Sequence, residues 1–266
     1  MKPLVIDSHA QVGSGETWAE PQRQVDYQLE QVLARAAEAG IDRSCIMAPK
    51  NDSYEEKNKE IARLCARYPE KLIGFAVHIP QRETGRLASM LREEVQVLGL
   101  KGVKSDGHPT RELLDAVAEL RIPVIYYPEP RAEDGPARMF YEMASVYPSV
   151  DFILPHLGSY RSADWWAHIE TIDLAKRYPN VYVETSGIGS HKYLEMAAHD
   201  LPAEKILFGS YSSELDSRVE IHAVQLLKLP SPQETQILGG NIQRLLGRWT
   251  IQVGRPVSRL EQPTMA

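Results

Sequence analysis

Eight short apolar segments, separated by longer amphipathic ones, run along most of this chain. Parallel strands that are covered on both faces have this apolar character. The segments lie at residues 4–6, 44–47, 72–77, 102–104, 123–127, 152–154, 181–184 and 206–208. Helical patterns lie at residues 25–39, 54–67, 84–98, 110–120, 137–146, 165–177, 192–199 and 218–227. The alternation predicts a parallel α/β sheet, and eight repeats predict that it closes into a single (β/α)₈ barrel, the TIM barrel.

The length of the chain agrees with one barrel. The chain has 266 residues, and such a barrel takes about 250. We therefore expect a barrel domain over residues 1–250, with an extra C-terminal helix at 232–246 and an irregular tail at 251–266. An open, doubly wound sheet is the competing architecture. No Gly-x-Gly-x-x-Gly motif follows the first strand, which counts against its dinucleotide-binding form.

Charge and composition narrow the classes of partner. The net charge is -6 and no run of Lys or Arg occurs, so nucleic acid and anionic membrane are poor candidates. No segment approaches the roughly 20 apolar residues of a membrane span, and no apolar leader precedes the first strand. The two cysteines, Cys45 and Cys65, are compatible with a reducing compartment. We expect a cytoplasmic protein that acts on a small molecule, and a homo-oligomer is left open.

Several motifs follow one another from residue 5 to residue 247. Val5–His9 reads VIDSH, Leu154–Ser159 reads LPHLGS, Ile206–Ser210 reads ILFGS, and Gly239–Gly247 reads GGNIQRLLG. Further matching stretches lie at residues 67–75, 100–104, 122–125 and 180–186. In order and spacing these motifs resemble the signatures of the amidohydrolase-2 family of metal-dependent hydrolases. The resemblance implies a TIM barrel whose active site lies at the C-terminal ends of the strands.

The same resemblance implies a metal site that this chain has altered. In the family, a divalent ion sits on two histidines after strand one, a histidine after each of strands five and six, and an aspartate after strand eight. The corresponding positions here are His9, Gln11, Tyr127, His156 and Tyr211. An amide is a poor zinc ligand, and a tyrosine ligates well only as the phenolate, whose reference pKa is about 10. We therefore expect a degenerate metal site and no cofactor.

Polar residues at the strand ends are the candidate catalytic groups, because barrel active sites lie there. We assign this role to His9, Lys104, Tyr127, His156, Glu184 and Tyr211. Lys104 would hold a substrate anion or pair with Glu184. The two tyrosines would polarise a carbonyl group, or would simply fill the space of the lost metal. One of the two histidines would move a proton.

Other polar residues near the strand ends are candidates for substrate binding. They are Gln11, His78, Asp106 and Glu129. His78 also opens an alternative, in which His9, His78 and His156 together hold Zn²⁺. Against this, most isolated histidines at a rim bond to neighbouring groups and bind no metal.

These residues lead to one main interpretation and two rivals. The main interpretation is a metal-independent member of the family that acts on a small organic acid, ester, lactone or related carbonyl compound, with a carboxylate-bearing substrate favoured by Lys104. The first rival is a metal-bound hydrolase or decarboxylase that uses the three histidines. The second is a pseudoenzyme that binds a ligand without turnover. Hydrolysis and decarboxylation both occur in the family, so the resemblance does not choose between them.

Overall fold

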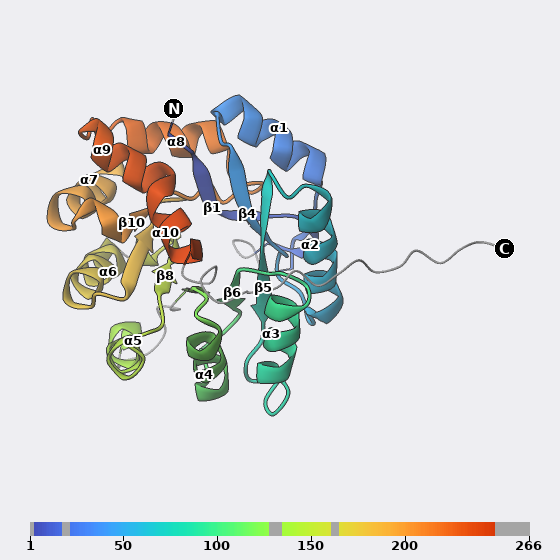
Figure 1. The fold of residues 1–266 in the computed structure, drawn as a ribbon. Coiled ribbons are helices and arrows are strands. Elements are labelled where there is room, and N and C mark those ends of the chain that lie inside the picture. Colours follow the sequence, from blue (N-terminus) through green and yellow to red (C-terminus); the bar gives the residue numbers. More distant parts are fainter. Residues whose placement is uncertain (1–2, 18–21, 128–134, 161–164, 248–266) are drawn as a thin grey trace.

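The computed structural model describes residues 3–17, 22–127, 135–160 and 165–247. Eight parallel strands stand side by side around a common axis, with helices outside them (Figure 1). In spatial order the strands are β1 (Ile6–Gln11), β4 (Arg43–Met47), β5 (Leu72–His78), β6 (Gly102–Ser105), β7 (Val124–Tyr126), β8 (Phe152–Leu154), β9 (Val181–Glu184) and β10 (Ile206–Leu207).

The first and last strands meet and close the barrel. The Ser8 amide donates to the Phe208 carbonyl at 3.0 Å, and the Gln11 amide donates to the Ser212 carbonyl. A parallel bridge joins Ala10 to Ser212. The predicted (β/α)₈ barrel is therefore confirmed.

Each strand of the barrel is followed, directly or after a connecting segment, by a helix that packs an apolar stripe against the sheet. The helices are α1 (Leu29–Ala39), α2 (Glu55–Arg67), α3 (Leu87–Gln96), α4 (Arg111–Leu120), α5 (Gly135–Val146), α6 (Trp165–Arg177), α7 (His191–Asp200) and α8 (Ser217–Gln225). Helix α4 illustrates how the sequence sets the bounds. The Thr110 hydroxyl accepts the Leu113 amide at the N-terminus, and Leu113, Val117 and Leu120 are buried on one side.

Strand residues alternate between the barrel interior and the helix layer. Phe75, Val77 and Leu207 belong to the cluster inside the barrel, whereas Ala76 and Val103 belong to the cluster between strands and helices. This parity decides which polar residues at the strand ends can face the barrel mouth.

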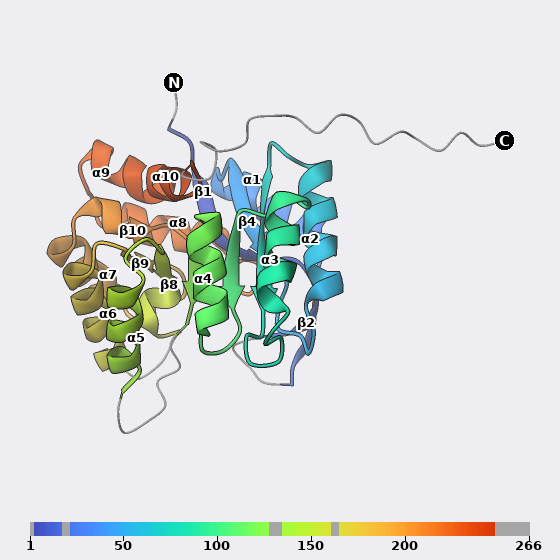
Figure 2. The ribbon, with the colours of Figure 1, turned by 60° about the horizontal axis from the view of Figure 1, so that its bottom comes forward.

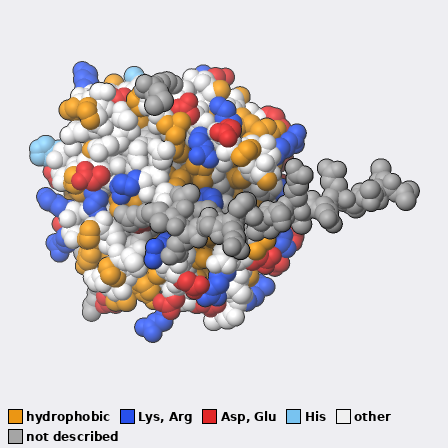
Figure 3. Space-filling view, in the orientation of Figure 1, with side chains coloured by type: hydrophobic (Ala, Val, Ile, Leu, Met, Phe, Trp, Pro, Cys, Tyr) orange, Lys and Arg blue, Asp and Glu red, His pale blue; other side chains and the backbone are white. Residues whose placement is uncertain are grey.

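The last described helix covers the end of the barrel at which the strands begin. Helix α10 (Asn241–Gly247) places Ile242 and Leu245, both fully buried, in the interior cluster. Figure 2 shows α9 (Ser231–Thr235) and α10 together at the end where the strands begin. On the face seen in Figure 3, basic and acidic side chains are interspersed among the described residues. None of the described helices is long and apolar enough to cross a membrane.

The structure differs at two places from the secondary structure predicted from the sequence. The predicted helix at residues 25–39 begins only at Leu29, because Gln24–Tyr27 forms strand β3, which pairs with β2 (Gly13–Glu16) in an antiparallel hairpin. The predicted single helix at 232–246 is divided into α9, a π-helical turn (Gln236–Gly240) and α10. In that turn Gly239 lies so close to the Leu4 carbonyl that a Cβ atom would collide with it. The expected tail at 251–266 lies outside the described residues.

Candidate active site

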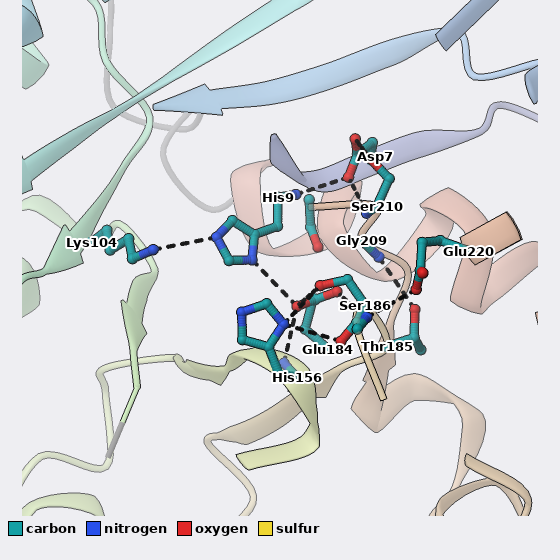
Figure 4. A network of polar contacts seen from close by, with 12 residues as sticks. Asp7, His9, Lys104, His156, Glu184, Thr185, Ser186, Gly209, Ser210 and Glu220 are labelled. Carbon is teal, nitrogen blue, oxygen red and sulfur yellow. Dashed lines mark hydrogen bonds and ion pairs between the residues drawn. The ribbon is translucent and has the colours of Figure 1, made fainter. Parts of the chain in front are cut away.

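Four buried polar side chains, three from strands and one from the turn after a strand, converge at the C-terminal end of the barrel (Figure 4). His9 comes from β1, Lys104 from β6, Glu184 from β9, and His156 from the 3₁₀ turn after β8. Their side chains form a chain of contacts: Lys104 Nζ lies 3.4 Å from His9 Nε2, and His9 Nδ1 lies 3.4 Å from Glu184 Oε2. None of the four residues is more than 5% exposed. Residues far apart in the sequence therefore form one buried polar cluster.

The Glu184 carboxylate is held rigidly by groups that donate to it. It accepts the amides of Ser186 (2.5 Å) and His156 (3.2 Å), and the Ser186 hydroxyl at 2.9 Å. Gly209 makes room for it, because a Cβ atom at that position would collide with the carboxylate. Burial raises the pKa of Glu184, and the His156 ring and these hydrogen bonds oppose the rise.

His156 is oriented by a backbone carbonyl. Its Nδ1 lies 3.0 Å from the Ser186 carbonyl oxygen and 3.0 Å from the Ser186 hydroxyl. With the proton on Nδ1, the carbonyl accepts it and Nε2 is left as a free lone pair. Burial lowers the pKa of His156 to about 3, so the ring is neutral at physiological pH. The residue has φ of 59°, a left-handed conformation that is strained for a residue other than glycine and is common at functional sites.

His9 and Lys104 influence each other's protonation. Burial lowers the pKa of Lys104 to about 8, although the charges of Asp106 and Glu184 oppose the shift. Burial and the charge of Lys104 lower the pKa of His9 well below its usual value. At pH 7 the pair is therefore an ammonium beside a neutral imidazole. The His9 backbone is fixed by Asp7, whose carboxylate accepts the amide at 3.0 Å.

Aromatic rings enclose the two histidines. The ring centroid of Tyr211 lies 4.9 Å from that of His9 and 4.6 Å from that of His156. The ring of Tyr127 lies edge-on to His156 at 6.0 Å, and its hydroxyl accepts the Tyr160 amide at 3.3 Å. Burial raises the pKa of Tyr211 well above its usual value, so this phenol donates a proton in hydrogen bonds and does not give it up.

Gln11 lies beside Tyr211 with its amide unsatisfied. Its neighbours in sequence, Ala10 and Val12, pack in the helix-facing cluster, so Gln11 points into the barrel. It is 1% exposed, and neither its oxygen nor its nitrogen makes a well-aligned hydrogen bond. A side-chain hydrogen bond from Gln11 opposes the rise in the pKa of Tyr211, so the amide and the phenol lie within reach of each other even though their geometry falls short of a well-aligned bond.

His78 does not join this cluster, which corrects the three-histidine alternative. It follows Ala76 by two residues on β5 and so faces the helix layer. Its Nδ1 lies 2.8 Å from Glu83 and its Nε2 lies 2.7 Å from Glu94. Both ring nitrogens are therefore occupied by carboxylates, and no lone pair is left for a metal or substrate.

The remaining two predicted substrate-binding residues have different outcomes. Asp106 accepts the Tyr54 hydroxyl at 2.6 Å and acts on Lys104 through its charge. Burial raises the pKa of Asp106. Glu129 lies outside the described residues.

Three of the clustered residues form a donor set for a divalent metal. The potential ligand atoms of His9, His156 and Glu184 lie within 4.8 Å of one another. Two imidazoles and one carboxylate are a known ligand set of catalytic zinc, and the bond of a ligand histidine to a carbonyl, here from His156 to Ser186, is the usual support of such a site. The donors therefore fit a metal. Glu184, which supplies the third donor, is not among the five positions that the family resemblance implies, and this is why the sequence predicted a loss of metal binding.

Two residues that hold the site residues in place were not predicted from the sequence. Ser186 donates to Glu184 and approaches His156, and Ser210 donates to Asp7 through both its amide (2.8 Å) and its hydroxyl (2.6 Å). Each lies two or three residues beyond a strand end, within a motif that had been noted only for its family likeness.

Comparison with known proteins gives a family and a set of similar folds. The family model described as amidohydrolase matches residues 6–248, whereas no curated protein sequence matches the chain.

Three solved structures illustrate the similar folds. The 2,6-dihydroxybenzoate decarboxylase from Rhizobium is 16% identical, with a TM-score of 0.69, and the alignment covers 92% of this chain and 99% of that one. A dihydroxybenzoic acid decarboxylase from Polaromonas, with bound manganese and 2-nitroresorcinol, is 18% identical, with a TM-score of 0.68 and coverages of 91% and 96%. A probable 2-pyrone-4,6-dicarboxylic acid hydrolase from Acinetobacter baumannii, with citric acid bound, is 17% identical, with a TM-score of 0.69 and coverages of 91% and 99%. At these identities the likeness concerns the fold.

Proposed function

The chain belongs to the amidohydrolase family, and from this premise we propose that it is a metal-dependent decarboxylase of a small, carboxylate-bearing aromatic or related acid. The observation that carries the proposal is Lys104, a buried ammonium group in contact with His9 at the strand ends. A buried cation at this place favours an anionic substrate group. Dihydroxybenzoate, which names one of the similar structures, is an acid of this class.

Tyr211 favours decarboxylation over hydrolysis. Hydrolysis needs a base that takes a proton from the attacking water. The family resemblance places an aspartate with this role where Tyr211 stands. Because burial keeps Tyr211 protonated, it cannot accept that proton. Decarboxylation needs a proton donor instead, which Lys104 supplies.

The donor set His9, His156 and Glu184 supports a metal requirement. A divalent ion there would polarise a substrate oxygen as a Lewis acid. Ser186 fixes the carboxylate of Glu184 and the ring of His156, so that both ligands are preorganised. We therefore replace the metal-independent interpretation with a metal-dependent one.

The reaction can be written with the groups of this chain. Lys104 pairs with the substrate carboxylate, and the bond between that carboxylate and the adjacent carbon breaks, releasing CO₂. The electron pair of the bond stays on the carbon, which takes a proton from the Lys104 ammonium. Solvent returns a proton to the amine. Tyr211 and Tyr127 exclude bulk water around the histidines.

The test is CO₂ release from a panel of hydroxybenzoic acids and related acids, with the manganese- or zinc-loaded protein in ²H₂O. We expect a product with one deuterium at the carbon that carried the carboxylate. Lys104→Met should abolish the activity and weaken carboxylate binding by about 1.5–3 kcal/mol, the usual contribution of a charged hydrogen bond. Lys101→Met is the matched control, because Lys101 immediately precedes the first residue of the same strand and burial lowers its pKa to about 8 as well.

A hydrolase is the second candidate, because Glu184 sets a carboxylate next to two histidines. Ring opening of lactones or pyrones, with no CO₂ release, would replace decarboxylation by this activity. Tight binding of carboxylates without turnover of any acid, ester or lactone in the panel would support the pseudoenzyme.

A further inference from the structure

Tyr160 belongs to the group of aromatic rings that encloses the two histidines of the site. Its ring centroid lies 4.9 Å from that of His156 and 5.2 Å from that of Tyr211, and both contacts are edge-to-face. Tyr211 is 1% exposed and His156 is 5% exposed, whereas Tyr160 is only half-buried. Of these three rings, Tyr160 is therefore the one that a molecule entering from solvent can touch.

The turn after β8 brings Tyr160 back onto the site. His156, Leu157 and Gly158 all have positive φ, of 59°, 47° and 81°. The left-handed conformation is unfavourable for a residue that has a Cβ atom, so two such residues in succession indicate that their surroundings hold them there. The Ser159 amide closes the turn by donating to the His156 carbonyl at 3.0 Å. As a result, the Tyr160 ring packs against the ring of a residue only four positions earlier.

Neighbouring segments hold Tyr160 on both sides. Gly187 lies so close that a Cβ atom there would come within 2.7 Å of two carbons of the Tyr160 ring. The Gly187 amide donates in turn to the Glu220 carboxylate of α8 at 2.9 Å. On the other side, the Tyr160 amide donates to the Tyr127 hydroxyl at 3.3 Å. Neither of the two apolar clusters formed by the described residues includes Tyr160, so the ring is fixed at the barrel mouth without belonging to the core.

The rings lead from Lys104 towards Tyr160. Lys104 Nζ contacts the His9 ring, whose centroid lies 5.3 Å from that of His156. His156 in turn contacts Tyr160. An acid whose carboxylate meets Lys104 can therefore extend along these rings. The edge of one aromatic ring is attracted to the face of another because their quadrupoles are complementary, whereas a saturated ring gains only from the burial of its area.

We propose that Tyr160 is a specificity-determining residue that selects aromatic acids, because its ring forms the wall against which the substrate ring packs. The inference deepens the proposed function and rests on it only for the carboxylate that Lys104 holds. Tyr160 would thus set the class of acid that is bound, aromatic over saturated, while the clustered polar residues carry the chemistry. The buried Tyr211 supports the wall from behind.

The test compares benzoate with cyclohexanecarboxylate, two acids of equal ring size that are both anionic at neutral pH. Calorimetric titration of the manganese-loaded protein should show about three- to tenfold tighter binding of benzoate, the usual contribution of an aromatic pair. Tyr160→Leu should reduce this preference to less than twofold, because it removes the ring and leaves Lys104 in place. Tyr160→Phe keeps the ring without the hydroxyl and should retain the preference.

Tyr193→Leu is the matched control. Tyr193 on α7 is also half-buried, and its ring also packs on a histidine, His168, with the centroids 4.7 Å apart. This pair lies in the helix layer, away from the barrel mouth. Tyr193→Leu should therefore leave the preference between the two acids unchanged. Melting curves of the variants check that each one is folded.

The outcomes separate this inference from the proposed function. Equal binding of the two acids by the parent protein would remove the aromatic wall and leave the carboxylate site standing. A preference that survives in Tyr160→Leu, or one that is lost in Tyr160→Phe, would overturn the role of the Tyr160 ring. If Lys104→Met keeps both the affinity for benzoate and the preference, the wall stands and the carboxylate anchor fails. If neither acid binds the parent protein, both proposals fail together.

Discussion

His78 should make the stability of this protein fall steeply above neutral pH. Its ring is fully buried between β5 and α3, with Glu83 at 2.8 Å on one nitrogen and Glu94 at 2.7 Å on the other. Asn58 fixes the second carboxylate by donating to it at 2.8 Å. Burial alone would lower the pKa of His78, but the hydrogen bonds to the two carboxylates outweigh burial and raise it to about 9. The imidazolium is therefore the form that the folded protein prefers.

The size and the sign of the effect follow from this pKa. In the unfolded chain the pKa returns to about 6.5, so the proton on His78 contributes roughly 3 kcal/mol to the free energy of unfolding. Between these two pH values the folded protein holds a proton that the unfolded chain has released. The stabilisation is thus fully present below about pH 6.5 and is lost as the pH rises through about 9, by up to about 1.4 kcal/mol per pH unit.

Urea unfolding at a series of pH values from 6.5 to 9 measures this contribution. Lysines with lowered pKa, such as Lys104, also titrate in this range, so the comparison is between the parent and His78→Gln. The variant should be less stable at pH 6.5, and the difference should shrink by roughly 3 kcal/mol towards pH 9. His168→Gln is the control, because the buried His168 bonds to the Leu157 carbonyl at 2.9 Å and contacts no carboxylate in the hydrogen bonds of the described residues. Stability curves of parent and His78→Gln that run parallel over the whole range would refute the reasoning.

Three further perturbations address the site and its frame. Gly209→Ala should lower the free energy of unfolding by about 1–3 kcal/mol, because the new Cβ collides with the Glu184 carboxylate; an unchanged denaturation midpoint would contradict this packing. Ser186→Ala should weaken manganese or zinc binding about 10- to 100-fold in a calorimetric titration, since it removes a donor to Glu184, and an unaltered affinity would place the metal elsewhere. Glu214→Ala should speed hydrogen exchange in the β2–β3 hairpin, because the carboxylate accepts the hydroxyls of Thr17 (3.1 Å) and Tyr27; Glu38→Ala, on an exposed ion pair, should leave exchange unchanged.

The fold was predictable from the sequence because the same pattern, an apolar segment followed by an amphipathic one, occurs eight times. Eight apolar segments and eight amphipathic ones leave few architectures, and the helix predicted at 165–177 is the one observed. The hairpin was missed for a physical reason. Its first strand is Gly13–Glu16, which has no apolar side chain, and its second, Gln24–Tyr27, is only four residues long and half-buried, so its two alternating apolar residues, Val25 and Tyr27, were read as the start of the following helix. Polar contacts support the pairing instead: the Gln24 side-chain amide donates across the strands to the Glu16 carboxylate at 3.1 Å.

The site was predictable only in part. The motifs and strand ends gave His9, Lys104, His156 and Glu184, but they did not give the distances that make a metal-ligand set of three of them. His78 also ends a strand, and the alternation of residues along that strand indicates on which side of the sheet it lies. Counting alternation along β5 would have placed it on the side of the helices, opposite to the residues that face the mouth.

Closure of the barrel by its two ends has a consequence for how the chain folds during synthesis. The bonds from Ser8 to Phe208 and from Gln11 to Ser212 join partners about two hundred positions apart, and Ile242 and Leu245 from α10 pack into the barrel interior. A nascent chain that has not yet emerged as far as β10 therefore leaves β1 without its second neighbour, and one that has not reached α10 leaves the end of the barrel uncovered by Ile242 and Leu245. Contacts of such long sequence separation slow folding. We expect β10 and α10 to dock late. Until they dock, chaperones can bind the exposed amino-terminal strands of the emerging chain.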